Sequence, residues 1–568
     1  MPGGVVEGAS VPRATRGSVP RRQPARESAA RTYARALPIV PVRARGLTIE
    51  GADGRRYLDC LSGAGTLALG HNHPVVLEAI REVLDSGAPL DVPDLPTPVQ
   101  EAFVIELLRT LPPGLADRAR VQFCGPTATD AVQAASRLVR TATGRPDILA
   151  FTDAHGTYSR AASEAPSSSA RATRLPYPQD YRRPFGIGGP YGAELAARWT
   201  ESLLDDPRPE APQPAGMILE PVQNEGGFLP APDSWLRRMR QITADRSIPL
   251  IVDESHTGVG RTGAFWAVDH SGITPDAMIL SQAIGGSLPL AVLVHRDDLD
   301  TGEPDTPAGP FRGNQLAMAA GTATMAYVRE NALTERAATL GTRMLTHLRQ
   351  LAREFPVIGD VRGRGLMIGL EMVDPAGDIE HIGPGFGERG GCDAEPALFD
   401  LSENPPAPNH APVSEGAVRT PLPDPNHPDG EAPAKARLLD AAGADWPGRR
   451  TSAHGIAERT PAPSTNHTAD SGTAATTSRP RPAAPELAAA IQRECLRRGL
   501  IVDLGGHHTN VVRLLPPLTI TDEQTNAVLD RLTDAVATVA GEYRAGGVGR
   551  VRGRVSGGDG RRGGRGDG

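Results

Sequence analysis

Three segments of the sequence place small or polar residues directly after short apolar runs. They are Cys124-Gly-Pro-Thr-Ala-Thr-Asp130, Leu250-Ile-Val-Asp-Glu-Ser-His256 and Ala277-Met-Ile-Leu-Ser-Gln-Ala-Ile-Gly-Gly-Ser287. The first is a turn that opens a helix. Its unpaired N–H groups and positive dipole end suit a phosphate, although an ordinary capped turn has the same pattern. A buried carboxylate at Asp253 needs a partner, either a cationic ligand atom or a structural ion pair or helix cap.

These segments belong to a longer alternation of apolar runs and helical patterns between about residues 120 and 294. The expected strands are 121–123, 148–151, 216–219, 250–252, 277–280 and 290–294. Helical spacing lies between several of them, as in residues 131–139 and 235–242. The alternation is typical of an α/β fold with a mostly parallel central sheet, in which ligands bind beyond the carboxyl ends of the strands.

Further elements are expected on both sides of this region. Residues 47–50 and 56–59 form an expected hairpin around the Asp53-Gly54 turn. Helical spacing covers residues 75–84, 315–328, 333–355, 484–498 and 521–542. Two more strands are expected at residues 500–504 and 511–515.

Length and composition restrict the class of protein. The chain has 568 residues, of which 39% are hydrophobic and 22% charged, which is typical of a soluble globular protein larger than one average domain. The net charge of −7 argues against a nucleic-acid partner, and no apolar run is long enough to span a membrane. The four cysteines form no CxxC pair, so no metal site or disulfide framework is indicated and a cytoplasmic location is expected.

Three stretches lack apolar periodicity and are rich in residues such as Pro, Gly, Ala and Arg. We expect residues 1–30, 376–482 and 546–568 to be disordered, although the Arg-rich first stretch is also compatible with a transit peptide. The remaining chain divides into domains in sequence order. The expected parts are a first portion of a small domain at 31–95, a large domain at 96–335, and the rest of the small domain at 336–375 and 484–543.

Taken in this order, the motifs resemble those of class III aminotransferases, and most of all the diaminobutyrate–2-oxoglutarate type. The resemblance covers nearly the whole expected ordered chain and includes Gly63-Ala-Gly-Thr-Leu-Ala-Leu-Gly70, Glu220-Pro-Val-Gln-Asn-Glu-Gly-Gly227, Phe311-Arg-Gly-Asn-Gln315 and Arg513-Leu-Leu-Pro-Pro517. It implies fold type I of the enzymes that use pyridoxal 5′-phosphate (PLP), with a smaller split α+β domain. It also implies a dimer with sites at the subunit interface, and amino and keto acids as substrates.

The resemblance assigns roles to five positions of this sequence. Asp253 matches the residue that pairs with the pyridine nitrogen of PLP, and Gly125 and Thr127 lie in the phosphate-binding loop. Glu225 matches a glutamate of the substrate site. Arg513 matches an arginine that pairs with a substrate carboxylate, for which a bidentate guanidinium is well suited.

The catalytic lysine of the family is replaced. In the family it attaches PLP covalently and then moves a proton, whereas this chain has Gln282 at the matching position. An amide is neither a nucleophile nor a useful base, so Gln282 can take neither role. The chain contains a single lysine, Lys435, which lies in the expected disordered insertion.

Further cofactor positions also depart from the family pattern. In the family the neighbouring subunit supplies a threonine that binds the phosphate. This chain has Pro310 at the matching position, and proline lacks both a hydroxyl and a backbone N–H. Where the family has an aromatic residue that stacks on the PLP ring, this chain has Ala154. The following residue, His155, could stack on the ring or act as a base. Ala128 replaces the second glycine of the family's phosphate loop, and His256 replaces the family's glutamine beside the ring oxygen.

Three functions remain open from the sequence. The first is a working or residual transaminase that exchanges an amino group between L-2,4-diaminobutyrate and 2-oxoglutarate. The second is an inactive homologue, a pseudoenzyme, that forms a homodimer or serves as the partner subunit of an active homologue. The third is a lysine-free enzyme that uses PLP or its amine form with His155 or His256 as the base.

Overall fold

The computed structural model describes residues 37, 39–93, 95–152, 172–205, 213–301, 312–377 and 480–556. All of them belong to one of the two compact units into which the chain divides. The expected positions His155, Pro310 and Lys435 lie outside the described residues. So do the first expected disordered stretch and residues 378–479, which make up nearly all of the second.

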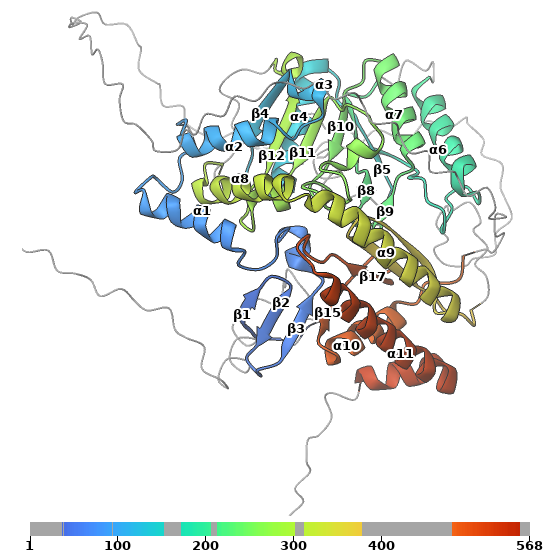
Figure 1. Cartoon of the computed structure of the whole chain (residues 1–568). Helices are drawn as coiled ribbons and strands as arrows, with labels where there is room; N and C mark the ends of the chain where they lie inside the picture. Colours follow the sequence, from blue (N-terminus) through green and yellow to red (C-terminus); the bar gives the residue numbers. More distant parts are fainter. Residues whose placement is uncertain are drawn as a thin grey trace, which may run out of the picture. The chain divides into compact units, whose positions relative to one another are not determined.

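The central sheet has seven strands, in the order β4-β12-β11-β10-β7-β5-β6. Strands β4, β12, β11, β10 and β5 are labelled in Figure 1. Their bounds are β4 (Ala119–Phe123), β5 (Ile148–Phe151), β6 (Ala172–Leu175), β7 (Gly216–Leu219), β10 (Leu250–Asp253), β11 (Ala277–Leu280) and β12 (Val292–Arg296). The neighbours from β11 to β6 are parallel, whereas β12 is antiparallel to both β11 and β4. The expected mostly parallel α/β sheet is therefore confirmed. The reversed strand and β6 were not expected.

The reversal of β12 follows from the short connection that precedes it. Only residues 281–291 separate β11 from β12, and they contain the 3₁₀ turn Gln282–Gly285. A parallel neighbour needs a crossover of about a dozen residues or more, usually with an α-helix. The chain therefore turns back at this point, and the residues of the turn remain at the carboxyl end of β11.

Helices cover both faces of the central sheet. Alternate residues of a strand point to opposite faces, so in β10 Ile251 packs with the apolar side of α4 (Ala128–Thr143). Leu250 and Val252 pack on the other face in the core cluster that includes α7 (Asp233–Asp245). Both faces of β10 are thus buried, which explains its uninterrupted apolar sequence.

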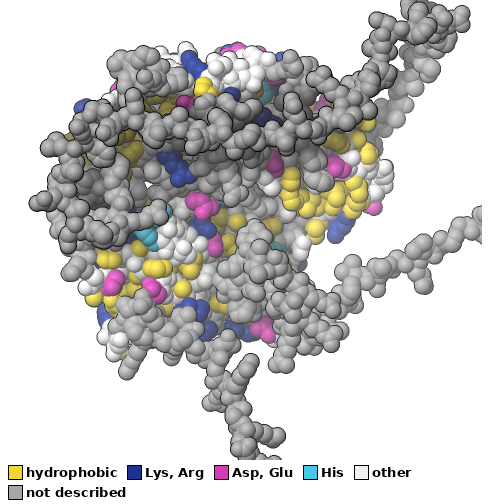
Figure 2. Space-filling model, turned by 180° about the vertical axis from the view of Figure 1, so that it is seen from behind, with side chains coloured by type: hydrophobic (Ala, Val, Ile, Leu, Met, Phe, Trp, Pro, Cys, Tyr) yellow, Lys and Arg dark blue, Asp and Glu magenta, His cyan; other side chains and the backbone are white. Residues whose placement is uncertain are grey.

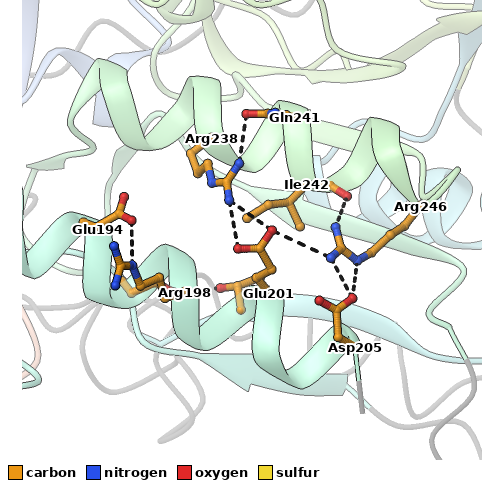
Figure 3. Close-up of polar contacts among 10 residues, drawn as sticks. Glu194, Arg198, Glu201, Asp205, Arg238, Gln241, Ile242 and Arg246 are labelled. Atoms are coloured by element: carbon orange, nitrogen blue, oxygen red, sulfur yellow. Dashed lines mark hydrogen bonds and ion pairs between the residues drawn. The ribbon is translucent and has the colours of Figure 1, made fainter. Parts of the chain in front are cut away.

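Ion pairs join α7 to α6 (Gly189–Leu204) on the outer layer (Figure 3). Arg238 binds Glu201 with an N–O distance of 2.8 Å. Arg246, directly after α7, binds Asp205, directly after α6, at 2.6 Å. These contacts fix α6 against α7.

Two smaller sheets bring distant parts of the chain together. One joins β1 (Pro41–Arg45), β2 (Thr48–Gly51), β3 (Arg56–Asp59) and β15 (Leu500–Ile501). The other has the order β13 (Ile358–Arg364), β14 (Met367–Met372), β17 (Val511–Leu514) and β16 (Asp503–Gly505). The expected hairpin around Asp53-Gly54 is the β2–β3 pair, and the single strand expected at 500–504 is two strands, because β15 and β16 join different sheets.

The remaining helices are α1 (Pro74–Asp85), α2 (Pro98–Leu108), α3 (Pro113–Ala116), α8 (Gln315–Glu330), α9 (Leu333–Glu354), α10 (Pro485–Arg497) and α11 (Asp522–Ser556). Of these, α1, α8, α9 and α10 have bounds close to those expected, whereas α2 and α3 were not expected and α11 is longer than expected. Helix α11 continues past Gly546, so the prediction of an unstructured tail from residue 546 is wrong for residues 546–556. That prediction gave weight to the low helix propensity of the glycines, which does not end the helix here. Among the described helices, none is long and apolar enough to cross a membrane.

Candidate functional site

A cavity of about 660 Å³ opens at the carboxyl ends of β10 and β11. Its volume is in the range of roughly 300–1,000 Å³ that is common for small-molecule sites. The wall is formed by Leu61, Gly63, Ala64, Thr127, Ala128, Thr129, Val132, Glu220, Asn224, Glu225, Asp253, Ser255, His256, Gln282, Asp503 and Arg513. The structure thus brings together seven of the residues predicted from the sequence, namely Thr127, Ala128, Glu225, Asp253, His256, Gln282 and Arg513.

Gln282 follows the last residues of β11 and begins the turn that leads to β12. Its φ of 55° lies in the left-handed region, which is uncommon for a residue with a side chain. The preceding Ser281 hydroxyl donates to the Leu290 carbonyl at 3.1 Å, which closes the base of the turn. The Thr66 hydroxyl donates to Oε1 of Gln282. The side chain at position 282 is therefore held on the cavity wall by a contact from the loop after β3.

The loop after β3 contains four consecutive residues with positive φ. Ser62, Gly63, Ala64 and Gly65 have φ values of 47°, 60°, 56° and 97°. Left-handed backbone at residues with a Cβ costs on the order of 1–3 kcal/mol each and persists only where the surroundings enforce it. Gly63 and Ala64 line the cavity, so this strained backbone is part of the site.

Asp253 and Ser255 present oxygen atoms at the end of β10. Asp253 is 7% exposed, and its Oδ1 accepts from the Ser255 N–H at 2.8 Å. The Ser255 hydroxyl is buried and has no hydrogen-bond partner among the described residues. Because an orphaned buried hydroxyl costs roughly 1–3 kcal/mol, this atom is suited to bind a ligand group in the cavity.

Glu254 lies between these two residues but does not line the cavity. Its carboxylate accepts from the Val268 N–H at 2.9 Å and from the Thr257 hydroxyl. Complete burial raises the pKa of Glu254 to about 7, and the nearby charge of Asp269 contributes in the same direction. Neighbouring carboxyl groups at the end of β10 thus lie in different environments, one in the cavity wall and one in the core.

The amino end of α4 forms another part of the wall. Thr127 is the N-cap, and its side chain and the Asp130 side chain form a reciprocal capping box. Oδ2 of Asp130 accepts from the Thr127 N–H at 3.0 Å and from its hydroxyl at 2.6 Å. Gly125 does not line the cavity but is required beside it, because a Cβ there would lie 2.6 Å from Asp130.

Arg513 reaches the cavity from β17, in the sheet that β17 forms with β13, β14 and β16. Its Nη2 donates to Asp503 on the neighbouring strand β16, and its Nη1 lies 3.3 Å from the Asn224 carbonyl oxygen. The guanidinium also lies over the Phe228 ring, 5.4 Å from its centroid. Glu225 does not contact this guanidinium; its Oε1 accepts from the Asn224 side-chain amide at 3.3 Å.

A buried ion network supports the loop that carries Asn224 and Glu225. Arg362 donates to the carbonyl oxygens of Gly226 and Gly227 at 3.3 and 3.0 Å, and its Nη1 lies 2.6 Å from Glu371. Burial alone would raise the pKa of Glu371, but Arg362 and Arg182 hold that pKa below its ordinary value. The network therefore remains charged and fixes the backbone after Glu225.

Several wall residues were not predicted from the sequence. Glu220 and Asn224 lie within the Glu220–Gly227 segment that carried the family resemblance, so the segment was identified but these two side chains were not. Thr66, which does not line the cavity itself but contacts Gln282 on its wall, lies in the Gly63–Gly70 segment, and the two residues are 216 positions apart in the sequence. Asp503 had one available signal, namely an acidic residue within an expected strand.

Comparisons with known proteins give a consistent result. A family model described as aminotransferase class III matches residues 29–389. A diaminobutyrate–2-oxoglutarate aminotransferase of Rhizobium meliloti is 51% identical over 372 residues, covering 64% of this chain and 79% of that protein. The protein of that name in Haemophilus influenzae is 44% identical over 363 residues, covering 62% and 79%.

Solved structures share the fold at lower sequence identity. An amine transaminase from an uncultivated Pseudomonas species, solved in its PLP-bound form, matches with a TM-score of 0.64 and 22% identity, covering 90% of this chain and 98% of that chain. The acetylornithine aminotransferase of Elizabethkingia anophelis matches with a TM-score of 0.59 and 19% identity, covering 90% and 96%. At these identities the likeness concerns the fold.

Proposed function

Because the chain belongs to the class III aminotransferase family, we propose that its cavity binds PLP and an amino or keto acid without the covalent step that transamination needs. The chain is then a pseudoenzyme related to diaminobutyrate–2-oxoglutarate aminotransferases. One observation carries this proposal. Gln282 occupies the cavity wall at the end of β11, and no lysine is present in any described range.

The residues of the cavity fit PLP as a noncovalent ligand. The amino end of α4 at Thr127 offers a hydroxyl and a positive dipole end for a phosphate. Asp253 offers a buried carboxylate for a protonated ring nitrogen, and the Ser255 hydroxyl lacks a partner within the described chain. Asp130 already accepts from Thr127, so a phosphate shares this end of α4 with a carboxylate and binds less tightly.

The chemistry divides between the cofactor and the protein. PLP, when bound, supplies an electron-withdrawing ring that stabilises negative charge on the substrate carbon beside it. Among the wall residues, Arg513 provides a guanidinium for a carboxylate, and Asp253 orients the ring. The amide of Gln282 accepts a hydrogen bond from Thr66, but it neither adds to an aldehyde nor takes up a proton near neutral pH.

Histidine chemistry is the second candidate function. His256 lines the cavity two residues after Asp253, so a base is present on the wall even without a lysine. A lysine-free reaction through His256 would remove the substrate α-proton. Proton–deuteron exchange at that carbon of L-2,4-diaminobutyrate, followed by nuclear magnetic resonance in deuterium oxide with PLP present, separates this function from that of an inactive protein.

The proposal is tested by titrating the full-length protein with PLP, reducing it with borohydride and measuring the masses of its peptides. We expect saturable binding, an absorption spectrum like that of free PLP, and no phosphopyridoxyl group on any peptide of the described chain. We also expect no glutamate from L-2,4-diaminobutyrate and 2-oxoglutarate. An adduct on a described residue, or catalytic formation of glutamate, would falsify the assignment as a pseudoenzyme.

We further propose that the chain associates with a second copy or with an intact homologue. Apolar side chains gather in patches on the surface in Figure 2. The exposed large apolar residues include Leu84, Leu90 and Ile105 on or beside α1 and α2, at 51, 50 and 46% exposure. Sedimentation of the Leu90→Glu/Ile105→Glu variant tests this surface, with Tyr191→Glu on α6 as the control. If the purified chain is a dimer in both variants, these residues are not its interface.

A further inference from the structure

The plane of the Arg513 guanidinium is fixed by strand β16. Asp503 lies directly opposite Arg513 in the antiparallel β16–β17 pair and accepts from Nη2. A Cβ at Gly505 would lie 2.6 Å from both Cζ and Nε of Arg513, so the guanidinium lies flat against this glycine. Any larger residue at position 505 would push the guanidinium away, and β16 therefore determines where Arg513 points.

The donors of Arg513 are used unequally. Nη1 faces Asn224, at 3.3 Å from its carbonyl oxygen and 3.4 Å from Oδ1. Nη2 faces Asp503, whereas Nε is buried and has no acceptor within the described part of the chain. Nε and Nη2 form one edge of the guanidinium, the arrangement that binds the two oxygens of a carboxylate. Asp503 therefore occupies only half of this edge.

Exposure differs between the two partners. The Arg513 side chain is 14% exposed and the Asp503 side chain 32%. A buried guanidinium needs an anionic partner, but the more exposed Asp503 carboxylate can turn toward water at a modest cost. The cavity wall also holds Glu220, Glu225 and Asp253, so an incoming carboxylate meets several negative charges.

We infer that Asp503 is a specificity-determining residue that occupies Arg513 until a ligand carboxylate displaces it. The inference rests on the proposed function, which gives Arg513 the role of binding that carboxylate. Once displaced, Asp503 remains beside the ligand. It repels a dicarboxylate and attracts a ligand that carries an ammonium group near its carboxylate. Asp503 thus favours diamino acids over dicarboxylic acids at the same guanidinium.

The test compares two ligands by calorimetry on the full-length protein, with pyridoxine 5′-phosphate present. This compound lacks the aldehyde of PLP and cannot react with an amine. The ligands are glutarate, a dicarboxylate, and L-2,4-diaminobutyrate. In Asp503→Asn we expect the affinity for glutarate relative to diaminobutyrate to rise about tenfold, the effect of one nearby charge–charge interaction. Asp205→Asn, which removes a carboxylate at the end of α6, is the matched control and leaves the ratio unchanged.

Further variants separate failure of the inference from failure of the proposed function. Asp503→Ser replaces Asp503→Asn if the latter does not fold, and Asp503→Glu retains the wild-type ratio. Arg513→Met abolishes glutarate binding; if it has no effect, both proposals are wrong. An unchanged or lower ratio in both neutral variants, with Arg513→Met effective, overturns the role of Asp503 alone. Failure of PLP to bind, with the expected shift in ratio, overturns the proposed function alone.

Discussion

The Thr66 hydroxyl donates a hydrogen bond to Oε1 of Gln282, which joins the loop after β3 to the carboxyl end of β11. The threonine thus serves as donor to an amide oxygen on the cavity wall. A hydroxyl can also accept a hydrogen bond, so the same residue can bind an ammonium or amine at position 282 without moving. The surroundings of residue 282 are compatible with a long basic side chain.

Gln282→Lys is expected to restore covalent attachment of PLP. The strand end places residue 282 on the cavity wall, and Asp253 lies on the same wall. Attachment should be weak and transamination slow, because Asp130 competes with the phosphate at α4. Borohydride reduction and peptide mass measurement check this, with Gln282→Met as a control of similar length that lacks an amine. Absence of a phosphopyridoxyl group on residue 282 would show that this side chain does not reach the cofactor.

Gly125→Ala should destabilise the protein through Asp130. The added Cβ would lie 2.6 Å from the Asp130 carboxylate and should break the capping box with Thr127. Loss of such a cap costs about 0.5–2 kcal/mol in free energy of unfolding. In an Asp130→Ala background the same substitution should cost nearly nothing further, because the clashing group and the cap are already absent.

Gly144→Ala is the control for the effect of Gly125→Ala with and without Asp130. Gly144 follows the other end of α4 with φ 67°, and a Cβ there would meet nothing within 4 Å. Its cost, on the order of 1 kcal/mol, comes from backbone strain alone and should be the same with or without Asp130. Urea denaturation of the six proteins measures both effects. Equal costs for Gly125→Ala in the two backgrounds would show that Asp130 is not the group displaced.

Arg362→Met should be strongly destabilising. It would leave Glu371, which is 3% exposed, with Arg182 as its remaining cationic partner, and would release the carbonyls of Gly226 and Gly227. Breaking a buried ion pair costs about 3–5 kcal/mol. Arg118→Met makes the same chemical change in a pair with Asp297 whose side chains are 50 and 40% exposed, and should cost about 0–1 kcal/mol. If chemical denaturation shows similar losses of unfolding free energy for Arg362→Met and Arg118→Met, the buried Arg362 network does not stabilise the protein more than a surface ion pair does.

Glu254 should make stability fall as pH rises toward neutrality. Its pKa is raised from 4.5 to about 7 by burial, so between these values the folded protein retains a proton that the unfolded chain releases. The stabilisation is fully present below about pH 4.5 and is lost as pH rises through about 7, on the order of 3 kcal/mol in total.

Glu254→Gln tests this contribution because the amide does not titrate. The difference in unfolding free energy between the wild type and the variant should therefore change between pH 5 and pH 8, with the wild type losing more. Other groups contribute equally to both proteins and cancel. Glu201→Gln, in a partly exposed pair with Arg238, is the control and should show a constant difference. A constant difference for Glu254→Gln as well would mean that this carboxyl ionises normally in the folded state.

The sequence predicted those strands whose burial on both faces gives a continuous apolar run, such as β10 and β11. It did not predict β6, because Ala172–Leu175 contains Thr and Arg and follows a stretch without apolar periodicity. It also did not predict the reversal of β12, since an apolar run shows that a strand exists but not which way it points. For the site, motifs identified residues on strand ends and helix starts. Contacts such as Thr66–Gln282 or Asp503–Arg513 depend on how separate elements pack or pair, and single segments do not show them.

The segment that ends at residue 377 and the segment that begins at residue 480 are paired with each other in the fold. The Asp374 N–H donates to the Pro482 carbonyl at 2.9 Å, and Val373 and Ala483 form a β-bridge. The later segment then adds β17 to β14 and β15 to β3, so it docks through sheet pairing. The protein can therefore be expected to assemble from two separate polypeptides, residues 1–377 and 480–568. Arg513 comes with the second polypeptide, which means that in such a split protein the side of the cavity that Arg513 lines would form only upon association.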